Sequence, residues 1–293
     1  MKLITQPDAG VTPVVQAIRR AKRSINICIF RFDIAEIEQA LAAAVKRGVI
    51  VRALIAHTNR GGEGRLRKLE KRLLDAGVTV TRTADDLLRY HGKFLVVDDV
   101  LHVFGFNFTK LDIGKSRSFG LATRDKRTVQ EALRLFEADV TRNPYTPARS
   151  NLVVSPETSR VMLTAFLKGA KKDLSIYDEK IQDPTIIRLL KALAARGVRV
   201  RVLGHLKGPD GDVVVRPLKG LRLHVRAIVR DGTRAFVGSQ SLRKMELDKR
   251  REVGVLISNP TVTRKLLEVF DADWDASATK ADRKEEKQER AVA

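Results

Sequence analysis

The sequence predicts an α/β protein made of two pseudo-symmetric halves, each with a mixed β-sheet between helices. The main observation is an internal repeat: ALAAAVKRGVIVRALI (40–55) has a counterpart in LLKALAARGVRVRVLG (189–204), 149 residues later. Each copy joins an Ala/Leu-rich helix to an alternating Val-rich strand through an Arg-Gly pair. Glycine favours the position after the last helical residue, and alternation is typical of a half-buried strand.

The similarity extends to the elements on either side. Upstream, AKRSINICIF (21–30) matches AKKDLSIYDE (170–179), a basic helix end followed by a short strand, at the same offset. Downstream, the offset falls to about 133, and the pairs are HGKFLVVDD (91–99) with HVRAIVRDG (224–232), SFGLAT (118–123) with EVGVLI (252–257), and LRLFEADV (133–140) with LLEVFDADW (266–274). Each half therefore reads helix, strand, helix, strand, several strands and a final helix.

The offset shortens because the first half carries an insertion. The segment GGEGRLRKLEKRLLDAG (61–77) predicts an extra amphipathic helix, with apolar residues at helical spacing at Leu66, Leu69, Leu73 and Leu74.

The boundary between the halves is predicted at NPYTP (143–147), where two prolines interrupt the regular pattern. We therefore expect a first half at 1–146, a second half at 147–275, and a dispensable, charged C-terminal tail at 276–293.

The composition indicates a soluble protein whose surface attracts polyanions. The chain has 293 residues, with 56 Lys and Arg against 35 Asp and Glu, a net charge of +21. Such a surface attracts nucleic acid or an anionic membrane face. Aromatic residues make up only 5%, whereas a binder of single strands usually offers aromatic side chains for stacking between its cations.

The cellular setting follows from what the sequence lacks. No apolar run approaches the roughly 18–20 residues that span a bilayer, and the N-terminus has no apolar signal-peptide core. The single cysteine, Cys28, cannot form an intrachain disulfide. We expect a cytoplasmic protein, peripheral on the inner membrane face if its partner is a phospholipid.

Both halves carry the same polar motif. The first half has His91, Lys93, Asp98 and Asn107; the second has His224, Arg226, Asp231, Ser239, Ser241 and Glu252. Because alternate residues of a strand point to the same side, each half presents an imidazole beside a cation. Two such pairs in one pocket would hold the oxygens of a phosphodiester and stabilise charge in the transition state.

The order His-x-Lys-x4-Asp-x6-Gly-Ser-x-Asn, present twice, resembles the phospholipase D superfamily over nearly the whole chain. The resemblance implies a phospholipase D-like fold with one active site at the interface of the halves. It favours His91 as the nucleophile that forms a phosphohistidine and His224 as the general acid. The catalytic set it implies is His91, Lys93, Asn107, His224, Arg226 and Glu252, and the scheme needs no metal or other cofactor.

The halves depart from the family pattern in different places. With one residue deleted near Gly105 in the alignment, Asn107 falls on Ser241, and Ser118 falls on Glu252. The first half thus lacks a carboxylate at Ser118, and the second has Arg226 in place of Lys. Glu252 is expected to support one of the two histidines, with the choice left open.

The remaining motif residues are expected to act in support. Asp98 and Asp231 are interpreted as organisers of strand turns. Ser118, Ser239 and Ser241 are placed beside the catalytic set.

Three other features have mainly structural interpretations. Cys28 is expected to be a small buried hydrophobe, and His102 a histidine on a sheet surface. Phe104, Phe106 and Phe108 alternate beside Asn107, and they belong either to the core or to a lipid-facing mouth.

The predicted function is that of a metal-independent phospholipase D-like phosphodiesterase or phosphatidyltransferase, acting on phospholipid at an anionic membrane surface. A nuclease or DNA-end-processing phosphodiesterase of the same superfamily is the alternative, with nucleic acid as partner. A second alternative is a decayed binder of membrane or nucleic acid, since Ser118, Arg226 and Ser241 fit a decaying site. We expect a monomer because both half-sites lie in one chain.

Overall fold

The computed structural model describes residues 1–57 and 63–279. The first two residues of the predicted insertion, 61–62, and most of the expected tail, 280–293, lie outside the described residues. The final helix runs to Ser277, two residues past residue 275, where we expected the second half to end.

The elements of the first half alternate as the repeat predicts. They are β1 (Lys2–Gln6), α1 (Thr12–Arg19), β2 (Ser24–Ile29), α2 (Ala35–Lys46), β3 (Ile50–Ile55), α3 (Glu63–Asp75), β4 (Thr79–Arg82), β5 (Arg89–Tyr90), β6 (Phe94–Val97), β7 (Val100–Phe104), α4 (Lys110–Lys115), β8 (Ser116–Thr123) and α5 (Lys126–Thr141).

The second half repeats this order without a counterpart of α3, and two strands, β16 and β17, stand in the place of β8. Its elements are β9 (Leu152–Val154), α6 (Ser159–Lys168), β10 (Asp173–Ile181), α7 (Pro184–Ala194), β11 (Arg199–Leu206), β12 (Val214–Arg216), β13 (Arg222–Leu223), β14 (Arg226–Arg230), β15 (Arg234–Gly238), α8 (Lys244–Asp248), β16 (Arg250–Arg251), β17 (Val253–Ile257) and α9 (Pro260–Ser277).

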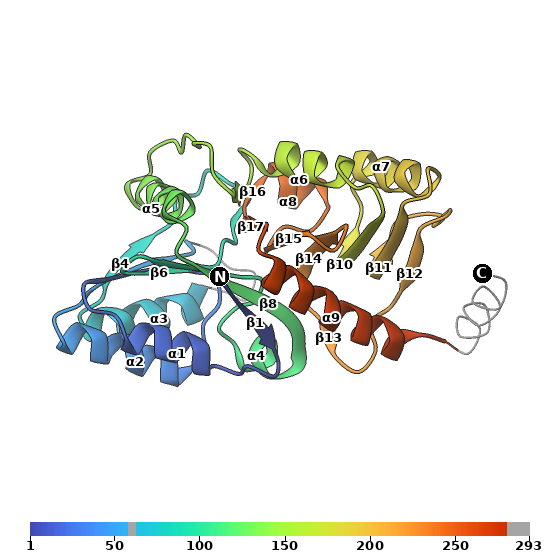
Figure 1. Ribbon diagram of the computed structural model, residues 1–293. Helices are drawn as coiled ribbons and strands as arrows, with labels where there is room; N and C mark the ends of the chain where they lie inside the picture. Colours follow the sequence, from blue (N-terminus) through green and yellow to red (C-terminus); the bar gives the residue numbers. More distant parts are fainter. Residues whose placement is uncertain (58–62, 280–293) are drawn as a thin grey trace.

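The two sheets have the same topology. The first has the order β1-β8-β7-β6-β2-β3-β4, and the second, read in the same direction, has β9-β17-β15-β14-β10-β11-β12. Both are mixed, because β2 and β10 each pair with a parallel strand on one side and an antiparallel strand on the other. Figure 1 shows α1, α2 and α3 on one face of the first sheet and α5 on the other. The predicted α/β fold with two pseudo-symmetric α-β-α halves is confirmed.

The halves share a core. One apolar cluster combines Phe119 of the first sheet and Val237 of the second with Phe136 of α5 and Phe270 of α9. Two further clusters lie under the helices of each half alone. Because the two sheets and the last helix of each half bury apolar surface together, the interface between the halves is part of the protein core.

Strand pairing corrects the predicted alignment of the repeats. In the first half, Val97 pairs with Val100 across a two-residue turn, whereas Arg230 pairs with Arg234 across three residues in the second half. The offset therefore changes from 133 to 134 in this turn and not near Gly105. The correspondence of Ser118 with Glu252 is unaffected.

Other predicted features have clear outcomes. The insertion forms α3, which buries Leu66, Leu69 and Leu73 and leaves Leu74 at 52% exposure. Cys28 is buried, as expected. The three phenylalanines at 104, 106 and 108 are fully buried in the first-half cluster, which assigns them to the core.

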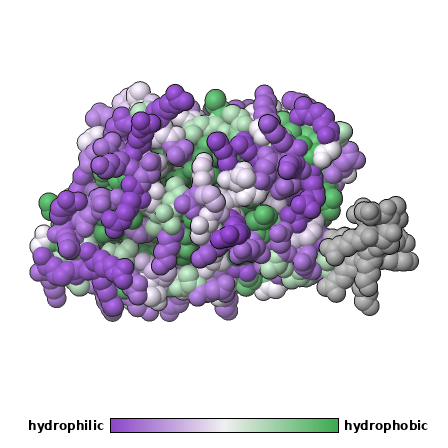
Figure 2. Space-filling model, in the orientation of Figure 1, coloured by the Kyte–Doolittle hydropathy of each residue, from purple (hydrophilic) through white to green (hydrophobic). Residues whose placement is uncertain are grey.

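The surface fits the charged composition. The face in Figure 2 is mainly hydrophilic, with apolar side chains in scattered places. Within the described residues, no helix combines the length and the hydropathy needed to cross a bilayer.

Candidate active site

In each half, the two residues just before the motif histidine form a short strand that pairs with the opposite half. Strand β5 pairs with β16 of the second half, and β13 pairs with β8 of the first. The residues that follow, His91 and His224, donate their backbone N–H groups to the carbonyls of Arg251 (2.7 Å) and Arg117 (3.3 Å). The exchange thus holds each histidine against the opposite half.

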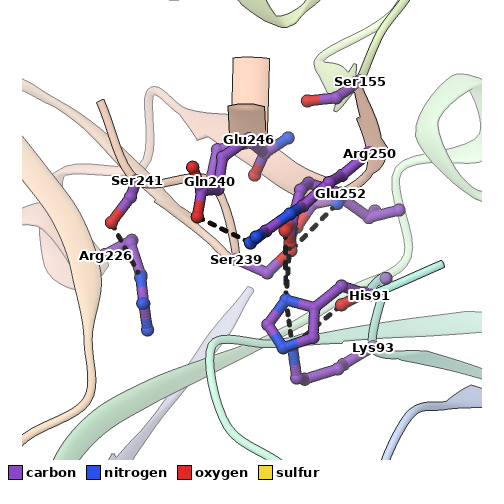
Figure 3. A network of polar contacts seen from close by, with 12 residues as sticks. His91, Lys93, Ser155, Arg226, Ser239, Gln240, Ser241, Glu246, Arg250 and Glu252 are labelled. Atoms are coloured by element: carbon purple, nitrogen blue, oxygen red, sulfur yellow. Dashed lines mark hydrogen bonds and ion pairs between the residues drawn. The ribbon is translucent and has the colours of Figure 1, made fainter. Parts of the chain in front are cut away.

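His91 lies in a network built from both halves (Figure 3). Its Nδ1 is 2.9 and 3.1 Å from the two carboxylate oxygens of Glu252. The Nζ of Lys93 is 3.1 Å from each ring nitrogen and donates to the His91 carbonyl at 2.8 Å. The ring of Phe30 packs edge-on against the imidazole at 4.9 Å between centroids. Glu252 therefore supports His91, which answers the question that the sequence left open.

Burial decides the charges in this network. It lowers the pKa of His91 to about 4, although Glu252 acts in the opposite direction. It also lowers the pKa of Lys93 to about 7. Burial alone would raise the pKa of Glu252, but His91 and Lys93 hold it at about 2. At neutral pH the imidazole is thus uncharged beside an ionised carboxylate, an arrangement that places the proton on Nδ1 and leaves Nε2 as a lone-pair donor.

His224 has a carboxylate neighbour that the motif did not reveal. Oδ2 of Asp112, on α4, lies 3.5 Å from Nδ1 of His224. The same oxygen accepts hydrogen bonds from the backbone and side-chain nitrogens of Asn107 at 3.0 and 2.7 Å, and Oδ1 accepts from Arg222 at 2.7 Å. Ser118 is fully buried with no hydrogen-bond partner for its hydroxyl within the described residues. Asp112 is therefore the carboxylate beside His224, at a distance at which His224 Nδ1 has no hydrogen-bond partner within the described residues.

Burial, followed by the charge of Arg226, keeps the pKa of His224 well below its usual value.

Arg226, the cation of the second half, is held by contacts on two sides. The Arg226 guanidinium donates to the hydroxyl of Ser241 at 3.2 Å and to Glu179 at 3.1 Å. Ser241 in turn donates to Asp178 at 2.7 Å. These contacts fix the direction of Arg226, and the contact with Glu179 is an ion pair.

A pocket of about 190 Å³ brings the two histidines together. It collects Asn107, Ser239 and Glu252 from the predicted set, together with His91, His224 and Arg226. Lys93 lies beneath His91 and is fully buried. The cations at the pocket wall are Arg31, Arg89, Arg222, Arg226, Arg243 and Arg250; the carboxylates are Glu179, Glu246 and Glu252. Such an excess of arginine suits a phosphate group.

A second, larger cavity of about 340 Å³ adjoins this pocket. The two share Phe30, Arg31, Asn107, Arg222 and His224. Its apolar wall consists of Phe30, Phe32, Leu66, Leu69 and Leu111. A ligand with a phosphate in the first pocket thus has apolar surface next to it.

The motif aspartates lie elsewhere. Asp98 and Asp231 occupy equivalent hairpin turns with φ of 52° and 51°. Asp98 accepts the backbone N–H groups of residues 22–24, and Asp231 accepts those of residues 171–173. Both tie a hairpin to the start of a neighbouring strand, and neither lines the pocket with the histidines.

Several pocket residues were missed at the sequence level, although the repeat carries a signal for them. Asp112 corresponds to Glu246 at an offset of 134, in KLDIG and KMELD, and Arg89 corresponds to Arg222 at 133. Glu246 is buried and bonds Arg243 and Arg250. Repeated charged residues outside the motif thus mark these four positions, but they do not reveal which side chains they contact.

The described residues contain no group of three or more His, Cys, Asp or Glu side chains arranged to hold a metal ion.

Comparison with known proteins identifies relatives of this arrangement. Residues 14–140 and 163–274 match the sequence family described as "Cardiolipin synthase, PLD-like domain". A mitochondrial cardiolipin hydrolase of Danio rerio is 29% identical over 134 residues, which cover 43% of this chain and 56% of that protein. The 5'-3' exonuclease PLD3 of Rattus norvegicus is 28% identical over 150 residues, covering 41% of this chain and 30% of that protein.

A solved structure extends the similarity to the complete fold. The phosphatidylserine synthase of Haemophilus influenzae Rd KW20 superposes with a TM-score of 0.71 at 13% identity, over 95% of this chain and 86% of its own. The match to the two curated relatives, by contrast, spans about half or less of their length.

Proposed function

This chain belongs to the cardiolipin synthase family of phospholipase D-like domains, within the phospholipase D superfamily of phosphodiesterases, and on that premise we propose that it hydrolyses or transfers the phosphatidyl group of phospholipids. The proposed reaction needs no metal and passes through a phosphohistidine on His91. Its substrate is a lipid phosphodiester that binds with phosphorus between the two histidines.

The first step follows from the protonation states. Nε2 of neutral His91 attacks phosphorus, so that a P–N bond forms while the P–O bond to the leaving alcohol breaks. His224 gives the leaving oxygen its proton. The positive charges of Lys93 and Arg226 stabilise the negative charge that develops on the phosphoryl oxygens. Burial, followed by the charge of Arg226, lowers the pKa of His224. The negative charge of a bound phosphate would act in the opposite direction and favour uptake of the proton that this step needs.

The second step reverses the roles. Water, or a second alcohol, gives its proton to His224 and attacks phosphorus, and the P–N bond to His91 breaks. In both steps, the Glu252 carboxylate accepts a hydrogen bond from Nδ1–H of His91 and so stabilises that imidazole. Water yields hydrolysis, and an alcohol yields transfer.

The observation that carries the lipid assignment is the apolar wall beside the arginine-lined pocket. Leu111 is 49% exposed at this wall, and Leu66 and Leu69 are buried in it. Apolar side chains next to a phosphate site favour a substrate that has hydrocarbon beside its phosphate.

A nuclease is the second candidate, because the pocket holds six arginines where one phosphodiester needs fewer. Paired assays distinguish the two. One contains vesicles of phosphatidylglycerol and phosphatidylcholine with glycerol, and the other contains single- and double-stranded DNA, both with EDTA. We expect lipid turnover that a His91→Ala/His224→Ala double variant lacks. Cleavage of DNA without turnover of lipid would show that the protein is a nuclease. Inactivity in both assays would favour a binding protein without catalytic activity.

The apolar wall gives a sharper variant. Leu111→Ser should raise KM for vesicle lipid several-fold while kcat changes little, because hydrocarbon contact is lost and the reacting groups are kept. Val161→Ser, which changes a residue of α6 that is 73% exposed, is the matched control. Equal KM values in the two variants would contradict binding of lipid at this wall.

The setting proposed with this function is a monomer that meets an anionic membrane peripherally. The net charge of +21 would attract such a surface. Co-sedimentation with anionic vesicles should therefore fall as salt increases, whereas zwitterionic vesicles should not retain the protein.

A further inference from the structure

A separate pocket of about 290 Å³ lies at the far end of the β6–β7 hairpin from His91, between α1 and the first sheet. Its lining residues are Lys2, Ile4, Pro13, Gln16, Ala17, Arg20, Val97, Asp98, Asp99, Val100, His102, Ala122 and Arg124. None of them belongs to the catalytic pocket.

In the second half, larger side chains occupy the region that is equivalent to this pocket. The helix offset of 149 places Ala17 opposite Phe166, and the strand registers place Ala122 opposite Leu256. Val97, the last residue of β6, corresponds to Arg230, the last residue of β14. In the first half each of these three positions holds the smaller residue.

Those larger side chains pack together in the second half. Phe166 is only 5% exposed. The Arg230 guanidinium lies 4.8 Å above its ring and donates to its carbonyl at 2.8 Å. The pocket in the first half is therefore space that the fold can fill and that Ala17, Val97 and Ala122 leave open.

The floor of the pocket has a ring nitrogen without a hydrogen-bond partner. His102 is 7% exposed, and its Nδ1 has no partner within the described residues, whereas the backbone of Leu95 and Val100 interacts with the ring and opposes the effect of burial on its pKa. Burial lowers the pKa of His102 to about 4, so the ring is uncharged at neutral pH. A buried polar atom without a partner costs free energy unless a ligand or water satisfies it. Its counterpart in the second half is the buried Phe236.

The rim of the pocket is cationic only in the first half. Lys2, Arg20 and Arg124 stand where the second half has Asn151, Gly169 and Ser258. Asp99 is 3.5 Å from Arg124 in an exposed pair, and Asp98 is occupied by backbone N–H groups. Lys2 and Arg20 have no ion-pair partner among the residues that the structure describes, and both line the pocket where an anion would bind.

We propose that this pocket is a binding site for a small organic anion, whose apolar body lies against Ala17, Val97 and Ala122 and whose anionic group meets Lys2 and Arg20. A polar group on that body would satisfy His102. The site is independent of the phosphodiesterase proposed above, and its volume restricts it to ligands smaller than a typical drug.

The test uses the full chain and sodium octanoate as the probe, because a carboxylate competes poorly for a phosphate pocket. Calorimetric titration should give one saturable site, with 1-octanol binding at least tenfold more weakly. Carbon and nitrogen NMR signals of the His102 ring should shift during the same titration.

Substitutions of pocket residues test whether octanoate binds in this pocket. Ala17→Phe, which installs the second-half residue, should abolish octanoate binding. Arg20→Ala should weaken it about tenfold, whereas Arg19→Ala, a charge change on the same helix outside the pocket, should not. Arg20→Ala alone decides the matter if circular dichroism shows that Ala17→Phe does not fold. No saturable binding, or equal binding by wild type and Arg20→Ala, would overturn the proposal.

Discussion

At the scale of single residues, the charges of Lys93 and His91 define a window of activity. Lys93 must be cationic to hold a phosphate, and its pKa lies at about 7. His91 must be neutral to attack, and its pKa lies at about 4. Activity should therefore fall as pH rises through 7 and as it drops through 4.

The pH profile of kcat/KM measures this, because it reports the free enzyme. We expect a bell between about pH 4 and pH 7. Lys93→Arg should remove the alkaline limb, since an arginine stays charged throughout; arginine is also the residue at the equivalent position, Arg226. An alkaline limb that persists unchanged in Lys93→Arg would show that another group causes it.

Asp112 and Ser118 give a second prediction at this scale. Asp112→Asn should lower kcat roughly 10–100-fold, the usual effect of removing a group that orients a reacting side chain. Ser118→Ala should change kcat less than twofold, because the Ser118 hydroxyl has no partner within the described residues. Steady-state kinetics of both variants, with circular dichroism to confirm folding, make the comparison. The reverse order of effects would return the supporting role to position 118.

The sequence predicted the histidines, the cations and Glu252 because they stand at fixed spacing on repeated strands. It could not predict that Asp112 lies beside His224. The α4 helix brings this residue to the adjoining cavity from five positions after Asn107. Its counterpart Glu246 bonds arginine side chains, whereas Asp112 bonds Asn107 as well as Arg222. A carboxylate that acts through the fold rather than through a motif leaves only a weak trace in the sequence.

At the scale of elements, α3 is the feature that distinguishes the first half, and it contributes Leu66 and Leu69 to the apolar wall. Leu69→Ala should destabilise the protein by about 2–5 kcal/mol, as expected for a leucine at 3% exposure. Leu74→Ala, at 52% exposure, should cost less than about 0.5 kcal/mol. Urea unfolding measures both, and equal losses would contradict the packing of α3 described here.

Helix and strand repeats made most elements predictable, including α3 with its leucine spacing. The exchanged strands β5 and β13 were not predictable. Each has two residues, too few for a periodic pattern, and each forms only because the opposite half offers an edge. The misplaced deletion near Gly105 has a similar cause, since a one-residue change in a turn alters no hydrophobic pattern.

At the scale of the whole molecule, the two halves are similar in backbone and different in chemistry. The shared core fixes their relative position, so the two half-sites form one pocket. Within that symmetry, Glu252 lies at 2.9 Å from His91, whereas Asp112 is 3.5 Å from His224. The closer carboxylate belongs to the histidine that we assign as nucleophile.

The most direct test of that assignment is to trap the covalent intermediate. The His224→Ala variant is mixed with phosphatidylglycerol vesicles, quenched at alkaline pH to preserve a phosphohistidine, digested and examined by mass spectrometry. We predict a phosphatidyl group on the peptide that contains His91, since attack needs only that imidazole and its Glu252 partner. Turnover by the wild type with no adduct on His91, or an adduct on His224 in the His91→Ala variant, would contradict the account.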